Sequence, residues 1–175
     1  MKTIDRLDRF LSKDPIYPDS VYISESADVI GDVVIGDYSS IWFNSVLRAD
    51  INFIRIGKNS NIQDGVVGHL SNDYPLIIGD LVTVGHGAII HACKIENECL
   101  IGMNSTILDG VVIGKNSIIA AGTVVPTGMV VPEGSLVAGI PGKIKRSLTN
   151  SQKKSIKNWA EKYVEVAKTY KEKGI

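Results

Sequence analysis

The sequence predicts an all-β fold, a parallel β-helix shaped as a triangular prism, with a C-terminal α-helix packed along it. Three observations support this prediction: an aliphatic residue at every sixth position, a glycine directly after many of these residues, and an amphipathic pattern after residue 150. Each hexad supplies one short strand and one turn, and three hexads close one coil. Neither the spacing of a helix nor the alternation of a hairpin strand explains a six-residue period.

The period runs through most of residues 20–140. The aliphatic positions are Ile23, Val29, Ile35, Ile41 and Leu47, then Ile56 and Ile62, then Ile78, Val84 and Ile90, then Ile95, Ile101, Ile107, Ile113, Ile119, Val125, Val131 and Val137. Their side chains should point into the prism and stack from coil to coil. The glycines that follow them suit tight corners, where a positive φ is often needed.

The period slips in three places. Leu47 and Ile56 are nine residues apart instead of six, with the extra residues around 49–53. Ile62 and Ile78 are sixteen apart, and the polar segment 69–76 between them predicts a loop that bulges from its coil. The third slip falls between residues 90 and 95, which are five apart. These irregularities indicate where a functional site should lie.

The chain of 175 residues predicts one prism domain with an appendage at each end. We expect an N-terminal segment at 1–20, the β-helix at 21–142 and the C-terminal helix at 143–175. Within the last segment, residues 151–172 follow helical spacing, and Thr149, Asn150 or Ser151 can cap the helix. The apolar stripe comprises Ile156, Trp159, Ala160, Tyr163, Val164, Ala167 and Tyr170.

Composition excludes several classes of function. Lysine plus arginine and aspartate plus glutamate number 19 each, a balance that argues against a nucleic-acid partner. No run of eighteen apolar residues is present, so no membrane-spanning segment is expected. Only Cys93 and Cys99 are available, too few for a disulfide framework, and this favours a reducing cytoplasm.

All three histidines, His69, His86 and His91, lie where the period slips. Neutral imidazole is the commonest metal ligand, and three histidines around zinc with one open position form a known catalytic arrangement. Once the slips are removed, Arg48, His69 and His91 stack on one face at about 4.8 Å per coil. His86 stacks with Asp64 on a different face.

One chain should therefore be unable to close a three-histidine site. A prism edge of about 17–20 Å separates the faces, whereas Zn–N bonds are about 2.0–2.1 Å. Two subunits placed corner to face can close it, with His69 and His91 from one and His86 from the next. Such a contact joins unlike surfaces and must close into a ring. We predict a homotrimer with three interfacial metal sites.

Several segments resemble the γ-class carbonic anhydrases and their close hexapeptide-repeat relatives, over nearly the whole chain. These segments are SSIWFNSVLRADI, NIQDG, VTVGHGAIIHAC, LIGMNSTILDG and AGIPGKIKR. The resemblance implies a left-handed coil and a trimer whose zinc, sometimes iron or cobalt, is held by three histidines across the interface. Those positions correspond here to His69, His86 and His91.

The resemblance also places Arg48 and Asp50 from RAD, and Gln63 and Asp64 from NIQD, around the metal. In the family the arginine pairs with aspartates across the interface and the glutamine orients the metal-bound solvent. The implied reaction is reversible hydration of CO2 to bicarbonate by a metal-bound hydroxide. Structural interpretations stay open: Arg48 and Asp64 as an intersubunit salt bridge, Gln63 as a stacked polar rung and Asp50 as a turn cap.

The chain departs from the best-established members of this family at the position after RAD. Ile51 stands where they carry a glutamate, so the residue that moves protons to the buffer is not identified. Two other functions are therefore compatible with the sequence. One is an acyl-CoA-dependent acyltransferase, which uses the same prism, and the other is a non-catalytic scaffold subunit stabilised by metal.

Overall fold

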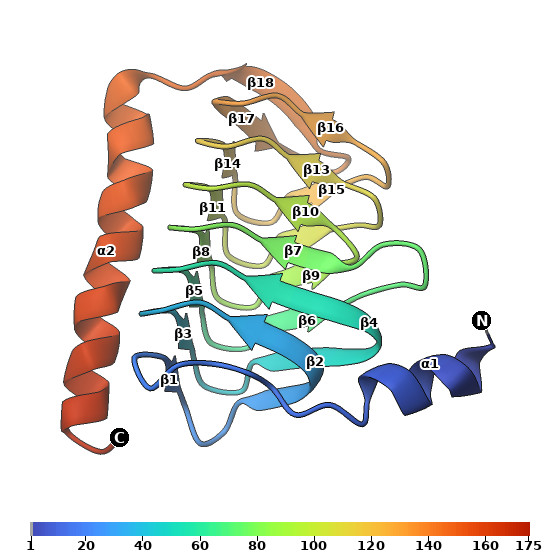
Figure 1. Ribbon diagram of the computed structural model, residues 1–175. Coiled ribbons are helices and arrows are strands. Elements are labelled where there is room, and N and C mark those ends of the chain that lie inside the picture. Colours follow the sequence, from blue (N-terminus) through green and yellow to red (C-terminus); the bar gives the residue numbers. More distant parts are fainter. Residues whose placement is uncertain (1) are drawn as a thin grey trace.

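The computed structural model describes residues 2–175 and confirms the predicted fold class, a left-handed parallel β-helix with a C-terminal helix along one face. Figure 1 shows the coils rising from the N-terminal base to the C-terminal end, with α2 beside them. The first face is an eight-stranded sheet. Its strands are β1 (Tyr22–Ile23), β3 (Ser40–Ile41), β5 (Asn61–Ile62), β8 (Thr83–Val84), β11 (Leu100–Ile101), β14 (Ile118–Ile119), β17 (Ser135–Ala138) and β18 (Lys143–Ser147).

The other two faces are joined by two long strands, β2 (Asp28–Ile35) and β4 (Val46–Ile56), which take part in both. The second face continues with β6 (Val67–His69), β9 (Ile89–His91), β12 (Thr106–Ile107) and β15 (Val124–Val125). The third face continues with β7 (Leu76–Ile78), β10 (Lys94–Ile95), β13 (Val112–Ile113) and β16 (Val130–Val131). Each face meets the next at a corner of the prism.

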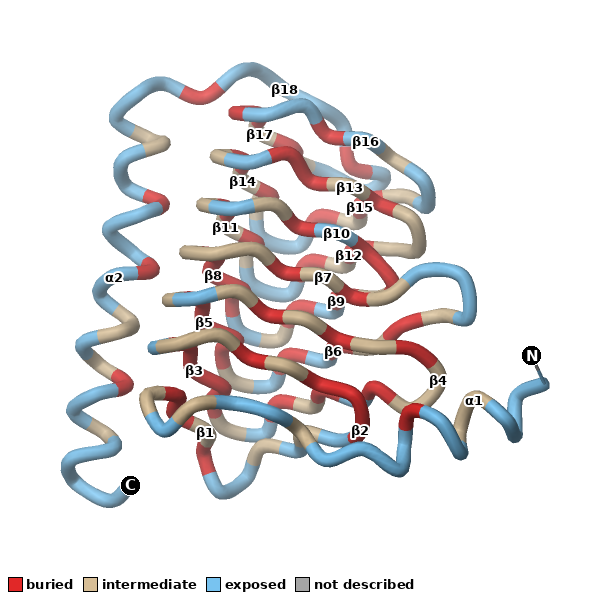
Figure 2. The backbone as a smooth tube through the Cα atoms, viewed as in Figure 1, coloured by how far each residue is buried: buried red, intermediate tan, exposed pale blue. Residues whose placement is uncertain are grey.

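The interior of the prism consists of the aliphatic columns that the period predicted. On the first face, Ile62 pairs with Val84, Val84 with Ile101, and Ile101 with Ile119, and all four side chains are fully buried. Figure 2 shows buried positions, in red, recurring from coil to coil along the prism. Strand pairing between coils satisfies the backbone groups, so the stack needs no aromatic core.

The glycines after the aliphatic positions do not have the positive φ that we expected of them. In each corner the positive φ falls two residues later, as at Asn104 (54°) after Gly102 and at Asn116 (56°) after Gly114. The glycines instead allow close approach between coils. A Cβ on Gly102 would lie 2.4 Å from the backbone nitrogen of Ala121.

Replacing Gly102 with alanine should therefore destabilise the prism by about 3 kcal/mol, because backbone cannot yield as a side chain does. Gly122 provides the control, since it has a φ of 68° and a Cβ there would meet nothing within 4 Å. Gly122→Ala should cost only about 1 kcal/mol of left-handed strain. Urea unfolding of both variants checks the order, and equal losses would contradict the close-approach argument.

The first slip in the period proved to be regular structure. We expected an irregular feature around residues 49–53, but β4 continues as one strand from the second face onto the third. Its partner β2 takes up the difference through a register shift between Gly31 and Val33. The second slip is a loop, between the end of β6 at His69 and the start of β7 at Leu76.

The C-terminal helix α2 spans Asn150–Glu172. Thr149 caps it: its hydroxyl accepts a hydrogen bond from the Gln152 amide, and the Gln152 side chain accepts one from the Thr149 amide. Residues 143–147, which we assigned to the helical segment, form β18 instead and pair antiparallel with β17. Within residues 2–175 no helix has the length and apolar character needed to cross a bilayer.

The apolar stripe of α2 faces the first sheet, where Ile156, Ala160 and Ala167 are buried. Trp159, which we also placed in this stripe, is 48% exposed, because it lines an open cavity between α2 and the first face. Near the base of the prism, Trp42 lies 5.5 Å from Tyr163 and 5.1 Å from Tyr170 between ring centroids.

The N-terminal segment contains a helix that the sequence analysis missed, α1 (Thr3–Phe10). Ile4, Leu7 and Leu11 follow helical spacing there, but the segment was too short to be assigned with charges on every side of these residues. The helix docks on the prism through Phe10, which is buried, and through Arg6, whose Nη1 donates to the Ile51 carbonyl at 3.1 Å. In Figure 1, α1 projects from the base on the side opposite α2.

Asp32 ties this N-terminal segment to β4. Its carboxylate lies 2.6 Å from the Lys13 ammonium and 2.8 Å from the Arg55 guanidinium, and its side chain is only 7% exposed. Burial alone would raise the pKa of Asp32, but the hydrogen bonds and charges of Lys13 and Arg55 outweigh it, and the pKa falls below its ordinary value.

We expect Asp32→Asn to lower the free energy of unfolding by about 1–3 kcal/mol. A carboxyl whose folded-state pKa is depressed stabilises the fold above its unfolded pKa and loses that contribution as pH falls through the folded pKa. The difference between wild type and variant should thus be present at pH 7 and shrink below about pH 4. Denaturant unfolding across pH 2–7 tests this. The control is Glu161→Gln, which removes a carboxylate from the exposed ion pair with Lys157. A difference that grows on acidification would contradict the assignment.

Candidate metal centre

His69 and His91 lie side by side at the ends of β6 and β9, as the six-residue period predicted once its slips were removed. The two residues are partners in the strand register, and His69 Nδ1 lies 3.1 Å from His91 Nε2. Their side chains are 19% and 33% exposed, so the pair faces outward from the prism. Gly68, directly before His69, occupies the inward-facing position of β6. Because it has no side chain, the Leu47 side chain fills the interior next to it.

Arg48 and Asp50 lie in β4, one coil below His69. Arg48 forms an ion pair with Asp50, and the second carboxylate oxygen of Asp50 lies 2.9 Å from His69 Nε2. Partial burial would raise the pKa of Asp50, but the hydrogen bond to His69 and the charge of Arg48 lower it below its usual range. The carboxylate therefore contacts the histidine and the arginine together.

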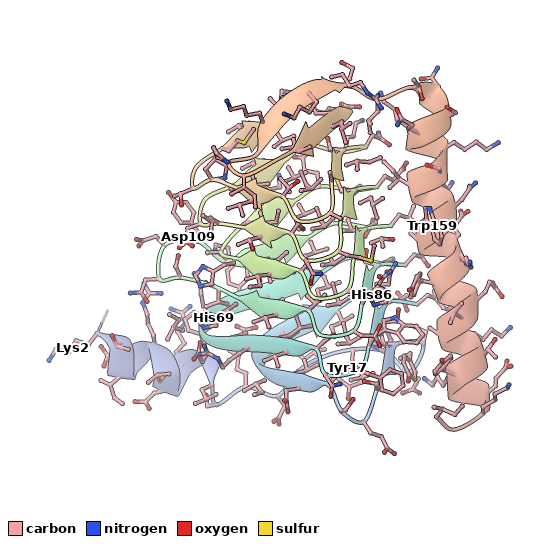
Figure 3. The ribbon with its side chains drawn as sticks, turned by 180° about the vertical axis from the view of Figure 1, so that it is seen from behind. Lys2, Tyr17, His69, His86, Asp109 and Trp159 are labelled. Carbon is pink, nitrogen blue, oxygen red and sulfur yellow. The ribbon has the colours of Figure 1, made fainter. Side chains whose placement is uncertain are left out.

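His86 and Asp64 form a second pair at another corner, between the first and second faces. His86 Nδ1 lies 2.7 Å from Asp64 Oδ2, and the side chains are 47% and 42% exposed. Figure 3 shows His86 toward α2 and His69 across the prism, near the other edge. Among residues 2–175 no group of three histidine, cysteine or acidic side chains comes together to hold an ion within one chain.

Gln63 follows β5 and lies on the side of His86, as predicted. It is 5% exposed, and its Nε2 donates to Asn61 Oδ1 at 3.0 Å. Asn61 in turn donates to the Thr83 hydroxyl at 2.9 Å. Gln63 is therefore part of a buried polar network, and it lines a cavity beneath α2 together with Trp159 and Tyr163.

Two further polar residues at these corners were not singled out from the sequence. Asn61 accepts a hydrogen bond from Gln63, and Asp109 Oδ1 lies 2.6 Å from His91 Nδ1. Figure 3 shows Asp109 above His69 on the same edge. The hexad frame contained a signal for Asp109, since it lies one coil above His91 and one residue further into the corner.

The histidine pair fits a divalent cation that prefers nitrogen ligands. Two nitrogens bound tetrahedrally at about 2.0–2.1 Å lie about 3.3 Å from each other, close to the 3.1 Å between His69 and His91. Metal-bound histidines usually donate the other ring N–H to a carboxylate, which leaves one nitrogen for the metal. His86 and His91 both have a carboxylate at Nδ1.

The repeated short strands and tight corners of its coils assign the chain to the class of hexapeptide-repeat β-helix proteins. Residues 92–127 match the family described as "Bacterial transferase hexapeptide (six repeats)". Relatives define the family more narrowly. The chain is 52% identical over 150 residues to a "Probable carbonic anhydrase" of Methanocaldococcus jannaschii, covering 86% of this chain and 94% of that protein.

A second relative is "Gamma carbonic anhydrase 2, mitochondrial" of Arabidopsis thaliana, 41% identical over 90% of this chain and 59% of that protein. The chain belongs to the γ-class carbonic anhydrase family. Among solved structures, a Bacillus cereus protein titled "putative acetyltransferase" superposes with a TM-score of 0.90 and 42% identity, over 92% of this chain and 94% of that one.

Proposed function

We propose that this protein catalyses the reversible hydration of CO2 to bicarbonate at metal ions shared between the subunits of a homotrimer. The observation that carries the proposal is the 3.1 Å spacing of two imidazole nitrogens at one corner, with the third histidine at another corner of the same chain. His69 and His91 of one copy and His86 of the next would hold the ion.

The ion proposed is zinc, with iron or cobalt as alternatives, because imidazole nitrogen suits all three. When bound, such an ion supplies hydroxide near neutral pH by lowering the pKa of coordinated water. In the chain itself, Nε2 of Gln63 is committed to Asn61, which leaves the side-chain oxygen of Gln63 to accept a hydrogen bond from solvent or from the hydroxyl of bicarbonate.

The positions of Arg48 below His69 and of Asp64 below His86 support an intersubunit role for Arg48 and Asp64. Arg48 lies one coil below His69, and Asp64 lies one coil below His86. A contact that brings His86 of one copy to His69 of another therefore also brings their Arg48 and Asp64 columns together. Arg48 is 46% exposed and Asp64 is 42% exposed, so both can reach a partner.

Apolar residues beside the histidine column support a contact with a second copy. Val67 and Ile89 directly precede the buried positions of β6 and β9, pair with each other in register, and are 42% and 44% exposed. Adjacent exposed apolar side chains on a flat sheet are typical of a subunit interface. We place the trimer contact over this part of the second face.

The test combines three measurements on purified protein: native mass, bound metal per chain, and the rate of CO2 hydration. We expect a trimer with one ion per chain and a hydration rate that is lost with chelator and restored by zinc, iron or cobalt. A metal-loaded trimer with no rate above buffer would contradict the proposed reaction and favour a scaffold role.

Acyl transfer is the second candidate function, because a solved structure with 42% identity is titled "putative acetyltransferase". Such an enzyme binds an acyl-coenzyme A and uses a single histidine as general base. Calorimetry with acetyl-coenzyme A separates the two functions. Saturable binding at micromolar concentration, unaffected by chelator, would favour acyl transfer.

We also assign the protein to the cytoplasm. The support is that Cys93 and Cys99 are both free thiols and both buried, as expected in a reducing compartment. Fractionation of cells that express the full-length protein tests the assignment.

A further inference from the structure

We propose that Asp109 is a positioning residue for the metal centre: its carboxylate holds His91 in the tautomer that leaves Nε2 free to bind a cation. This inference rests on the proposed function, because it concerns a ligand of the same site. Asp109 acts through His91 and is not itself a ligand, since it contacts the ring nitrogen that does not face His69.

The backbone fixes Asp109 within the corner above His91. The Asp109 carbonyl accepts a hydrogen bond from the Gly128 amide of the next coil at 2.9 Å, and the following amide, Gly110, donates to the Ala92 carbonyl at 2.8 Å. Neighbouring coils on both sides therefore hold this corner. Because the Asp109 backbone is fixed, only its side-chain rotamer has to be ordered for the carboxylate to contact the imidazole.

The hydrogen bond determines where the His91 proton lies. Asp109 Oδ1 is 2.6 Å from His91 Nδ1, a length typical of a charge-assisted hydrogen bond. An ionised carboxylate only accepts, so the proton is on Nδ1 and the lone pair is on Nε2. Nε2 is the nitrogen that lies 3.1 Å from His69. Only a nitrogen with a free lone pair can bind a metal.

The same arrangement occurs at the other corner. Asp64 lies 2.7 Å from His86 Nδ1, and it comes from the coil below, whereas Asp109 comes from the coil above His91. His86 and His91 therefore each have a carboxylate at Nδ1. In His91 the other ring nitrogen, Nε2, faces His69. The repeated contact indicates that both carboxylates hold the Nδ1 proton of their histidine.

The experiment compares Asp109→Ala and Asp109→Asn with wild type. In metal-free protein, long-range 1H–15N spectra report which ring nitrogen of His91 carries the proton. In the trimer, competition with a chelator measures the affinity for zinc. We expect wild-type His91 to be protonated on Nδ1, and Asp109→Ala to shift the proton toward Nε2 and weaken zinc binding by about 10- to 100-fold.

Asp109→Asn should retain most of the Nδ1 tautomer with a smaller loss of affinity, because its amide oxygen still accepts a hydrogen bond. Glu133→Gln is the control: it removes one carboxylate from another corner, where Glu133 pairs with Lys115 at 3.6 Å, and should leave both readouts unchanged. If Asp109→Ala does not fold, Asp109→Asn still tests the proposal through the reduced affinity.

The positioning role of Asp109 and the proposed function can be overturned separately. Unchanged His91 tautomer and unchanged zinc affinity in the Asp109 variants would overturn the positioning role while leaving the proposed function intact. Wild-type protein that binds no metal would overturn the proposed function, and the tautomer spectra would then decide alone whether Asp109 sets the protonation of His91.

Discussion

Replacing His86 with alanine is expected to abolish metal binding and CO2 hydration while leaving the prism folded. Loss of a partner that only orients a ligand costs about 10–100-fold in metal affinity, so loss of the ligand itself should cost more than about 100-fold. The His86 side chain is 47% exposed and contacts Asp64, so its removal creates no cavity in the core. Elemental analysis and stopped-flow hydration assays measure the two losses.

The folded state of this variant is checked on metal-free protein, where His86→Ala and wild type should unfold within about 0.5 kcal/mol of each other. Lys115→Ala, which truncates a half-exposed side chain at another corner, is the matched control and should keep full metal content. A His86→Ala protein that still holds one ion per chain would show that His86 is not a ligand.

Replacing Ile101 with alanine should produce the largest loss of stability, about 2–5 kcal/mol. Ile101 is fully buried between Val84 of the coil below and Ile119 of the coil above, so truncation leaves a void in the stack on both sides. Ile101→Val should cost only about 0.5–1.5 kcal/mol, since it removes one methylene from the same place. Denaturant unfolding of both variants provides the measurement.

Met103 supplies the surface control for this pair, because it lies two residues away and is 53% exposed. Met103→Ala should stay within about 0.5 kcal/mol of wild type. A loss at Ile101 no larger than the loss at Met103 would mean that the aliphatic columns do not carry the stability of the prism.

The sequence predicted the faces of the prism because the interior repeats strictly. A six-residue period assigns every residue to a face, so the columns of His69 with His91 and of Asp64 with His86 followed from counting alone. The left-handed sense of the coil and the chemistry around the metal came from the resemblance. Both are properties that spacing does not contain.

Features outside the repeat were harder to predict. The helix at Thr3–Phe10 has only eight residues, and among them only Phe10 is buried, so few positions in the sequence marked it. Trp159 follows helical spacing but is 48% exposed, because it lines an open cavity between α2 and the first face. These errors arise from tertiary contacts, which residue spacing does not specify.

Asp109 was missed for a different reason. The six-residue period is compatible with a position near His91, but a lone aspartate before a glycine is also the ordinary residue of a turn, and Gly110 does adopt a positive φ of 69°. The 2.6 Å contact with His91 Nδ1 distinguishes the two roles. That contact depends on the rotamer of the aspartate and the orientation of the ring.

The most direct test of the shared site is a mixed trimer made from two inactive chains. One chain carries His86→Ala and the other carries both His69→Ala and His91→Ala, so neither alone can form a complete ligand set. When the two are unfolded together and refolded in equal amounts, His69 and His91 of the first should meet His86 of the second at about one quarter of the interfaces. Metal content and hydration rate should then rise to about one quarter of the wild-type values. Mixed trimers that bind no more metal than either parent would contradict the intersubunit site.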